Sequence, residues 1–339
     1  MGVSRAIVFI AFAAALAPAA QAQSVADFFR GKTLRVIVPT APGGDRALYA
    51  APVVSVLGKH IPGNPTVVAS YMPGAGGANG VNYLANVAAP DGLTIATPLA
   101  PVVVAQATGD AAAKYDVRRM NWIGRTADAT RIFFVWHTVD VRGLDDLKRK
   151  QITSGSSGRS SETYINPAVM NYLLGTKIKI ISGYQAVAEV NNATEKRETD
   201  ASFTTWNDIG NTHADWVRDG KVRILAQIAL AKHRALPDVP LLAEWADNDA
   251  DRAVIEFMAS SSQMGQSFVA PAGTPAPIVE AMRRAFDATM QDPEFRGMMQ
   301  GARLEISAMK GEALQGFVER TMAAPAAVVA RYKAATAAE

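Results

Sequence analysis

The stretches LRVIVPTAPGG (residues 34–44) and TVVASYMPGAGG (residues 66–77) each consist of a strand-like run followed by a glycine-rich turn. A helix-like segment follows each turn. A strand, a glycine turn and a helix N-terminus leave backbone N–H groups free and place the positive end of a helix dipole at the turn. Such an arrangement holds an anionic group without needing a charged side chain. The two turns therefore predict anion recognition.

Strand and helix patterns alternate along the rest of the chain. Apolar and β-branched runs predict strands at 34–38, 66–70, 93–97, 121–124, 131–136, 151–154, 177–181, 200–204, 222–228 and 268–271. Helical patterns are found at 46–57, 79–87, 143–150, 160–174, 186–197, 276–291 and 311–332. This alternation predicts an α/β fold with mainly parallel strands. Pro52 lies inside the first of these helices and predicts a kink or a late helix start.

The sequence of strand, glycine or serine turn, and helix occurs in two halves, at about 33–98 and 151–205. A chain of 339 residues also exceeds one ordinary hydrophobic core. We therefore expect two α/β lobes joined by crossing segments near Thr130 and Gly265. Residues 23–129 and 266–339 are assigned to lobe 1, and residues 130–265 to lobe 2. A ligand is expected in the crevice outside the strand ends, where the turns converge.

The first 22 residues have the pattern of a secretory signal peptide. Arg5 supplies a positive charge, residues 6–16 form a short apolar run, and Ala20-Gln21-Ala22 is a small-residue cleavage site. We expect cleavage near Ala22 and export to the periplasm; an uncleaved N-terminal anchor is the alternative. The chain has no cysteine, which excludes disulfides, thiolate catalysis and cysteine-bound metals.

The charge pattern does not favour nucleic-acid binding. Lysine and arginine total 34 against 31 acidic residues, and the densest basic run, 148–150, lacks interleaved aromatic residues. The glycines at 74–77 do not complete a dinucleotide-binding motif, and no Walker lysine follows either turn. Paired-histidine metal spacing is also lacking. We therefore expect no nucleic acid, no cofactor and no metal.

An exported serine hydrolase is the main enzymatic alternative. Residues 155–158 read GSSG, in which the glycines are one residue too close for the G-x-S-x-G nucleophile elbow. The chain has four histidines, and none is clearly placed as a general base. We expect no enzymatic activity. If the chain were a hydrolase, Ser156 or Ser157 would be its nucleophile.

Several charged residues lie near the turns. Asp45 can cap the helix after the first turn, and Asp200 and Asp208 can act as local caps. Arg46 and Arg131 can pair with an anionic ligand, although surface arginines are more often solvated or ion-paired. At this point both interpretations remain open for each of them.

An ordered series of motifs resembles one known family. The matching segments are GKT (31–33) through PGG (42–44), HIPGNP (60–65), MPGAGG (72–77), NYL (82–84), DG (91–92), LLGTK (173–177), GY (183–184), DVP (238–240) and FVAPAGTP (268–275). On these segments the chain resembles the extracytoplasmic solute receptors of tripartite tricarboxylate transporters, called Bug proteins in some bacteria. The likeness extends over nearly all of the chain after the signal peptide.

The resemblance implies a two-lobe periplasmic binding protein of the Venus-flytrap, type II-like class that closes on a small carboxylate. In such receptors backbone amides, hydroxyls and ordered waters hold the ligand, which passes to a large and a small membrane subunit. The positions that match are Pro42, Gly43, Gly44, Gly74, Ala75, Gly76, Gly77, Thr97, Ser154, Ser156, Ser157, Tyr184 and Thr204.

The chain departs from the family pattern near the first turn. Ala47 stands where members usually carry an aspartate, and Asp45 comes two residues earlier. Which carboxylate binds is therefore left open, and a sensor that serves a signalling partner remains an alternative to transport. We expect a monomer, because the C-terminal helices show no heptad seam.

Overall fold

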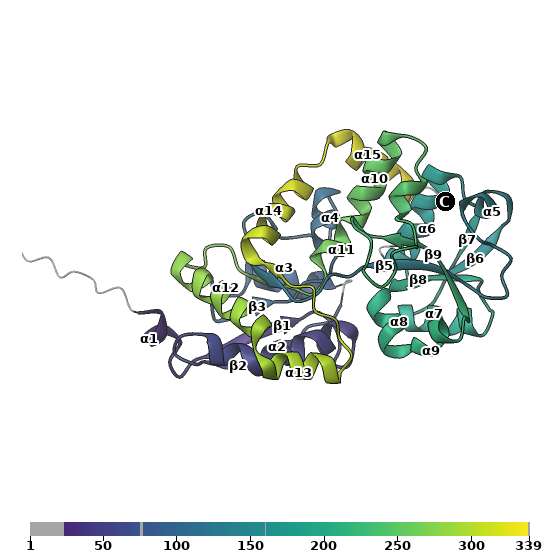
Figure 1. The fold of residues 1–339 in the computed structure, drawn as a ribbon. Helices are drawn as coiled ribbons and strands as arrows, with labels where there is room; N and C mark the ends of the chain where they lie inside the picture. The colour runs from purple at the N-terminus through teal and green to yellow at the C-terminus, as the bar shows by residue number, and fades with distance from the viewer. Residues whose placement is uncertain (1–23, 75–76, 160, 338–339) are drawn as a thin grey trace, which may run out of the picture.

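The protein is described by a computed structural model, which covers residues 24–74, 77–159 and 161–337. The expected signal peptide lies outside these residues. The chain forms two α/β lobes side by side, each built around one sheet (Figure 1). None of the helices in the described ranges is both long and apolar enough to span a membrane.

Lobe 1 contains a six-stranded sheet with the strand order β11-β4-β10-β3-β1-β2. Its strands are β1 (Thr33–Val38), β2 (Thr66–Tyr71), β3 (Thr94–Ala96), β4 (Asn121–Arg125), β10 (Ser267–Ala270) and β11 (Met309–Lys310). Lobe 2 contains a five-stranded sheet with the order β7-β6-β8-β5-β9. Its strands are β5 (Arg131–Trp136), β6 (Ile152–Ser156), β7 (Ile178–Ser182), β8 (Ala201–Thr205) and β9 (Val222–Ile228).

Both sheets are mixed, so the expectation of mainly parallel strands is wrong. Strand β1 is parallel to β2 and β3, and β6 is parallel to β7 and β8. Strand β10 is antiparallel to β3 and β4, and β5 is antiparallel to β8 and β9. Strands β5 and β10 directly follow the two crossings between the lobes. Each of these two strands therefore enters its sheet at the opposite end from its neighbours and runs antiparallel to them.

Helices cover both faces of each sheet. In lobe 1 they are α1 (Val25–Phe29), α2 (Asp45–His60), α3 (Ala78–Asn86), α4 (Val102–Ala107), α11 (Ser261–Met264), α12 (Ala276–Gln291), α13 (Pro293–Gly301) and α14 (Gly311–Met322). In lobe 2 they are α5 (Leu144–Arg149), α6 (Glu162–Leu174), α7 (Val187–Glu195), α8 (Trp206–Thr212), α9 (Ala214–Arg218), the 3-10 helix η2 (Leu242–Trp245), α10 (Asp249–Ala259) and α15 (Ala326–Ala337). Helix α2 begins at Asp45 and continues past Pro52, so no late start occurs.

The alternation of side chains along the strands builds a core on each side of a sheet. In lobe 1, Val36 packs with α2 and α12 on one face, whereas Ile37 packs with α3 and α14 on the other. In lobe 2, Phe133 faces α6 and α10, whereas Phe134 faces α8 and α9. The two cores on each sheet hold the adjoining loops at the sheet ends in place.

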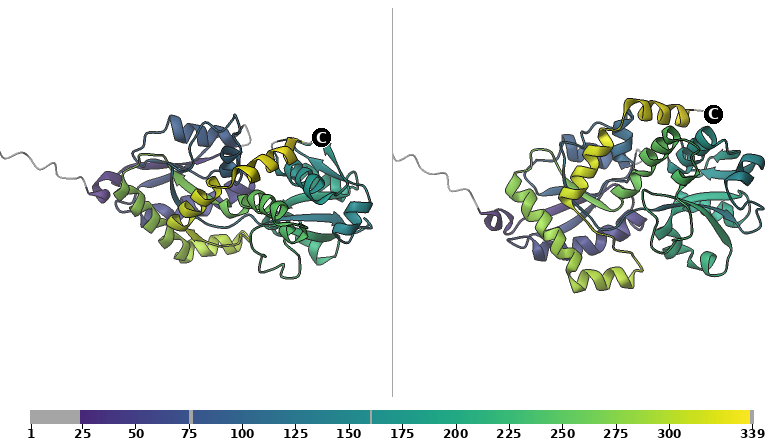
Figure 2. Two further views of the ribbon diagram at one scale, coloured as in Figure 1. Left: turned by 90° about the horizontal axis from the view of Figure 1, so that it is seen from above. Right: turned by 45° about the horizontal axis from the view of Figure 1, so that its top comes forward.

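The last helix links the lobes a third time. Residues 311–332 were expected to form one helix, but the chain turns at 323–325, before and at Pro325, and gives α14 and α15. Helix α14 packs on lobe 1, whereas Tyr332 of α15 is buried in the core of lobe 2. Figure 2 shows α15 lying along lobe 2 from two further directions. The division of the chain at residues 130 and 265 stays a prediction. That division assigns α15 to lobe 1, although this helix packs on lobe 2.

Candidate functional site: a charged cavity between the lobes

A cavity of about 370 Å³ lies between the two lobes. Lobe 1 lines it with the start of α2 and the loop before α4, and lobe 2 lines it with the starts of β5, α6 and α8. The lining residues are Thr40, Asp45, Arg46, Leu99, Ala100, Pro101, Ala129, Arg131, Ser161, Glu162, Thr163, Val187, Thr204, Thr205, Asp208 and Gln266. The cavity lies at the strand ends, where the sequence predicts a ligand.

Hydrogen bonds hold the side chain of Arg46 in place at the cavity. Its side chain is buried, and its Nη1 donates to the Gly265 carbonyl at 2.6 Å and to Thr97 Oγ1 at 3.4 Å. Its Nε has no hydrogen-bond partner among the described residues. Burial lowers the pKa of Arg46 to about 10, and the Asp45 carboxylate opposes that shift. Arg46 thus remains a cation at neutral pH.

Asp45 precedes Arg46 in the first turn of α2. Its Oδ2 accepts a hydrogen bond of 2.8 Å from Nε2 of Gln266, which belongs to the crossing segment before β10. Burial raises the pKa of the Asp45 carboxyl, Arg46 opposes the rise, and the charge of Asp208 in lobe 2 adds to it. Asp45 of lobe 1 and Asp208 of lobe 2 thus line the same cavity.

Arg131 is the first residue of β5 and forms an ion pair with Glu162 in the first turn of α6. Both side chains are largely buried, and Glu162 Oε1 also accepts from Ser261 Oγ at 3.1 Å. Burial lowers the pKa of Arg131 to about 10, while Asp45 and Asp208 raise it. A guanidinium carries five N–H donors, so the bond to Glu162 leaves others for a ligand.

The Asp208 carboxylate accepts hydrogen bonds from two residues of its own lobe. Thr204 Oγ1 donates to Asp208 Oδ2 at 2.7 Å, and Asn191 Nδ2 donates to the same atom at 3.0 Å. Asn191 in turn accepts from Ser202 at 2.7 Å. This network fixes one carboxylate oxygen of Asp208, its Oδ2.

The two crossing segments form the hinge between the lobes. Gln266 N donates to the Ala127 carbonyl at 2.7 Å, Thr126 N to the Gln266 carbonyl at 3.0 Å, and Ala129 N to the Ser262 carbonyl at 2.9 Å. At Gly265 a Cβ atom would lie 2.1 Å from the Ala127 carbonyl oxygen, so this close approach requires glycine. Because Arg46 and Gln266 both bind at this hinge, the cavity and the hinge share residues.

Comparison with known proteins identifies the family. A family model described as the tripartite tricarboxylate transporter family receptor matches residues 57–333. The chain belongs to this family. The match covers most of the chain and confirms the resemblance seen in the sequence motifs. No curated protein matches the chain significantly.

Solved structures of receptors share the two-lobe fold. A TctC solute-binding protein from Polaromonas, without ligand, is 18% identical with a TM-score of 0.66, over 86% of this chain and 96% of that one. The periplasmic binding protein BugD is 21% identical with a TM-score of 0.64, over 90% and 97%. MatC from Rhodopseudomonas palustris, with bound malate, is 18% identical with a TM-score of 0.63, over 90% and 99%.

The predicted ligand-binding residues of the receptor lie at different distances from the cavity lining. Thr204 lines the cavity, Gly44 is the N-cap of α2 directly before Asp45, and Thr97 lies behind Arg46. Gly77 is the N-cap of α3, and a Cβ atom there would lie 2.6 Å from Leu99 of the lining. Pro42 and Gly43 form an exposed turn, Gly74 is exposed, and Ala75 and Gly76 fall outside the described residues.

In lobe 2 of the receptor the predicted residues lie around β6, behind the lining. Ser154 and Ser156 are buried in that strand, and Ser157 Oγ donates to Ser161 Oγ at 2.9 Å. A Cβ atom at Gly155 would lie 2.9 Å from the Tyr184 ring, which packs over the strand. None of these four predicted residues lines the cavity, and their part in binding stays a prediction.

The charged lining differs from what the resemblance implies. From the sequence, Asp45 and Asp208 were expected to be local caps. Arg46 and Arg131 could pair with a ligand but were more often to be expected as solvated or ion-paired surface residues, and Glu162 was not singled out. The structure brings all five to one cavity. Glu162 had one usable signal, because Ser161 precedes it as the N-cap of a helix whose start follows a strand.

The hydrolase alternative finds no support in the receptor's contacts. Ser156 Oγ is bonded to the backbone of Gly158, and Ser157 Oγ to Ser161 and Thr163. Two of the histidines pair with acids elsewhere, His60 with Asp292 and His233 with Glu305. Within the described ranges, no histidine contacts either serine, and no group of three acidic or histidine side chains is placed to hold a metal ion.

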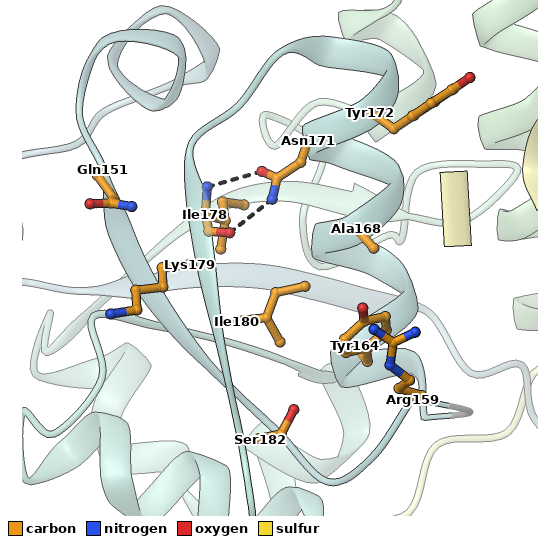
Figure 3. A pocket seen from close by; sticks show the side chains of 10 residues that line it. All are labelled: Gln151, Arg159, Tyr164, Ala168, Asn171, Tyr172, Ile178, Lys179, Ile180 and Ser182. Carbon is orange, nitrogen blue, oxygen red and sulfur yellow. Dashed lines mark hydrogen bonds between the residues drawn. The ribbon is translucent and has the colours of Figure 1, made fainter. Parts of the chain in front are cut away.

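A second hollow of about 610 Å³ lies on lobe 2 alone (Figure 3). It opens between α6 and the edge strand β7. Asn171 is bonded there to the backbone of Ile178: its Nδ2 donates to the Ile178 carbonyl at 2.8 Å and its Oδ1 accepts from Ile178 N at 2.9 Å. Arg159 lies over the ring of Tyr164. Since lobe 1 contributes no residue, closing the lobes cannot enclose a ligand in this hollow.

Proposed function

We propose that this receptor captures a small carboxylate between its lobes in the periplasm and delivers it to the membrane subunits of a tripartite transporter. The supporting observation is that two arginines, the buried Arg46 and the largely buried Arg131, line one cavity between the lobes of a solute receptor. Guanidinium groups bind carboxylates through short, charge-assisted hydrogen bonds. MatC holds malate, and a second similar structure, Rpa4515 from Rhodopseudomonas palustris, holds adipate, which agrees with this ligand class.

Helix N-termini add to the attraction for an anion. Gly44 provides no side-chain cap for α2, so the first N–H groups of this helix of 16 residues are free for a ligand. Helix α6, of 13 residues, also begins at the cavity. The positive ends of both dipoles therefore act together with the arginines.

A ligand held by groups of both lobes favours the closed state over the open one. Closure shifts the population only by the difference in binding free energy between the two states. Arg46 from lobe 1 and Arg131 from lobe 2 supply such contacts. The same arrangement binds and releases a solute without breaking a bond in it, so we propose that the protein is a receptor and not an enzyme.

A binding screen tests the proposal. The protein without residues 1–22 is titrated with small mono-, di- and tricarboxylates and with the corresponding amides. A carboxylate at 100 times its Kd is expected to add about 2.7 kcal/mol of stability and to raise the melting temperature. Its amide is expected to bind much more weakly, because the amide lacks the charge. Equal binding of acid and amide would contradict the proposal.

The double variant Arg131→Gln/Glu162→Gln tests the site itself. It removes the ion pair as a unit, so no unpaired charge is left buried. We expect the affinity for the carboxylate found in the screen to fall about tenfold to a hundredfold. Arg149→Gln is the matched control, since Arg149 pairs with Asp146 on the surface of the same lobe. Unchanged affinity in the double variant would place the site elsewhere.

A further inference from the structure

Strand β7 is the outermost strand of the lobe 2 sheet, and the hollow of about 610 Å³ extends along its outer side. At the opposite edge of this sheet, β9 is covered by the loop that follows it, since Gln227 N donates to the Pro240 carbonyl at 2.8 Å. An edge strand that is not covered offers its backbone N–H and C=O groups to another strand. The two edges of the lobe 2 sheet are therefore protected to different extents.

The hydrogen bonds of β7 show which of its backbone groups face the hollow. Ile152 N of β6 donates to the Lys177 carbonyl at 3.1 Å, so this carbonyl points into the sheet. The next residue, Ile178, points outward, where its N–H and C=O bond the side-chain amide of Asn171 (Figure 3). Asn171 thus takes the place of a neighbouring strand at Ile178. Because backbone direction alternates along a strand, the N–H and C=O of Ile180 also point outward, into the hollow.

The lining of the hollow differs between the two faces of β7. Ile178 is buried in the core beneath α6, so Ile180 lies on the same face, where Ala168 and the ring of Tyr164 also line the hollow. The side chain of Lys179 points to the opposite face (Figure 3). No acidic side chain is among the described residues that line the hollow. A strand placed beside β7 would therefore meet an apolar surface with every second side chain and a cation with the others.

We propose that this hollow binds an extended segment of a partner protein, in which apolar residues alternate with acidic ones, as an additional strand beside β7. The backbone of the segment pairs with Ile180, its apolar side chains pack against α6, and its carboxylates face Lys179. Arg159, over the Tyr164 ring, adds a second cation to the lining. A second copy of this chain does not fit, because pairing two β7 strands would bring their lysines together on one face. The site is separate from the ligand cavity, so this inference goes beyond the proposed function.

Two fluorescent peptides test the site by anisotropy on the protein without residues 1–22. Both are hexapeptides with blocked ends, one of alternating Val and Glu and one of alternating Val and Lys. We expect the Glu peptide to bind, and the Lys peptide to bind about threefold to tenfold more weakly. Lys179→Glu should reverse this order, whereas the control Lys221→Glu, beside β9 at the opposite edge of the sheet, should not. A Glu peptide that does not bind at about 1 mM, or an order that Lys179→Glu leaves unchanged, overturns the proposal.

N-methylated forms of the Glu peptide test the strand pairing itself. Neighbouring N–H groups of a strand face opposite sides, so methylating the valines blocks one edge of the peptide and methylating the glutamates blocks the other. We expect one form to bind about tenfold to a hundredfold more weakly and the other to bind as before, because one edge alone pairs with β7. Loss with methylated valines means an antiparallel strand, and loss with methylated glutamates a parallel one. Equal binding of the two forms would overturn the strand pairing and with it the proposal.

Discussion

At the scale of single residues, two adjacent side chains at the start of α2 form hydrogen bonds with different groups. Asp45 and Arg46 are neighbours at the start of α2, yet Arg46 is tied to the hinge carbonyl of Gly265 and Asp45 to Gln266. Both are removed from water, which disfavours the charged form of each. This cost in folding free energy is tolerated at the cavity, because the two charges there can interact with the charges of a ligand.

The titration of Asp45 gives a pH dependence. Burial raises the Asp45 pKa, so the folded protein binds this proton more tightly than the unfolded chain does. Stability without ligand should therefore fall, relative to Asp45→Asn, as pH rises from the ordinary aspartate pKa to the raised value. Melting at several pH values measures this effect, and the opposite sign would contradict the assignment.

Gly124 shows how tightly one residue can control packing. A Cβ atom at this position in β4 would lie 2.4 Å from two ring atoms of Phe286 in α12. We expect Gly124→Ala to destabilise the protein by about 1–3 kcal/mol through overpacking. Gly297→Ala is the control: Gly297 is exposed inside α13 with no atom within 4 Å of its added Cβ. That change should stabilise by about 0.5–1 kcal/mol, so chemical denaturation should give shifts of opposite sign.

At the scale of elements, α15 acts as a strap from lobe 1 to lobe 2. Arg331 Nε donates to Asp251 Oδ1 of α10 at 2.7 Å, and Tyr332 packs edge-on against Phe257 with ring centroids 5.4 Å apart. The turn at Pro325 is what directs the helix onto the second lobe. We expect a helix attached in this way to stabilise lobe 2 and to limit how far the lobes can open.

Removing the ring of Tyr332 tests the strap. Tyr332→Ala should cost about 3–5 kcal/mol, as for other large buried side chains. Amide hydrogen exchange should speed up in α6 and α10 and stay unchanged in the sheet of lobe 1. Tyr172→Ala is the matched control, since Tyr172 is 46% exposed on α6 and should change stability by less than about 0.5 kcal/mol. Similar losses for both tyrosines would argue against the strap.

At the scale of the whole molecule, a hydrogen bond outside the ligand cavity joins the lobes. His233 Nε2 of lobe 2 lies 2.8 Å from Glu305 Oε2 in the segment between α13 and β11. His233 Nδ1 accepts from Ala235 N, so the proton on Nε2 points to Glu305. Glu305 lies near Tyr49 of α2, and His233 lies near Trp206 of α8. The pair therefore lies between α2 and α8, two of the helices that begin at the cavity.

Breaking this pair should shift the molecule toward its open state. We expect His233→Ala to increase the radius of gyration without ligand, measured by X-ray scattering, and to lower ligand affinity about tenfold. His60→Ala is the control, because His60 pairs with Asp292 at 2.8 Å within lobe 1 alone. It should lower stability without changing the radius. An unchanged radius in both variants would show that the His233–Glu305 pair does not control closure.

Local patterns in the sequence were sufficient to place most elements. Runs of β-branched residues mark ten of the eleven strands, and the missing one, β11, has two residues. Helix α10 was overlooked, although Asn248 caps it and buried Val254, Ile255 and Met258 follow a helical period. The division of α14 from α15 was also missed, despite the signal of Pro325. These errors concern local features that a more careful reading of the same residues can find.

The site could be anticipated only in part, for a different reason. The sequence by itself determined two α/β lobes and the family, and it predicted a ligand at the strand ends, because strand period, glycine turns and motif order are properties of neighbouring residues. Which charges meet was decided by tertiary structure alone. Asp45, Arg131, Glu162 and Asp208 come from four separate elements of two lobes, and nothing local to any of them specifies the others. Burial in one cavity removes the water between these charges, which strengthens their electrostatic interactions. Residues that would otherwise be ordinary helix caps and ion pairs can therefore select a ligand.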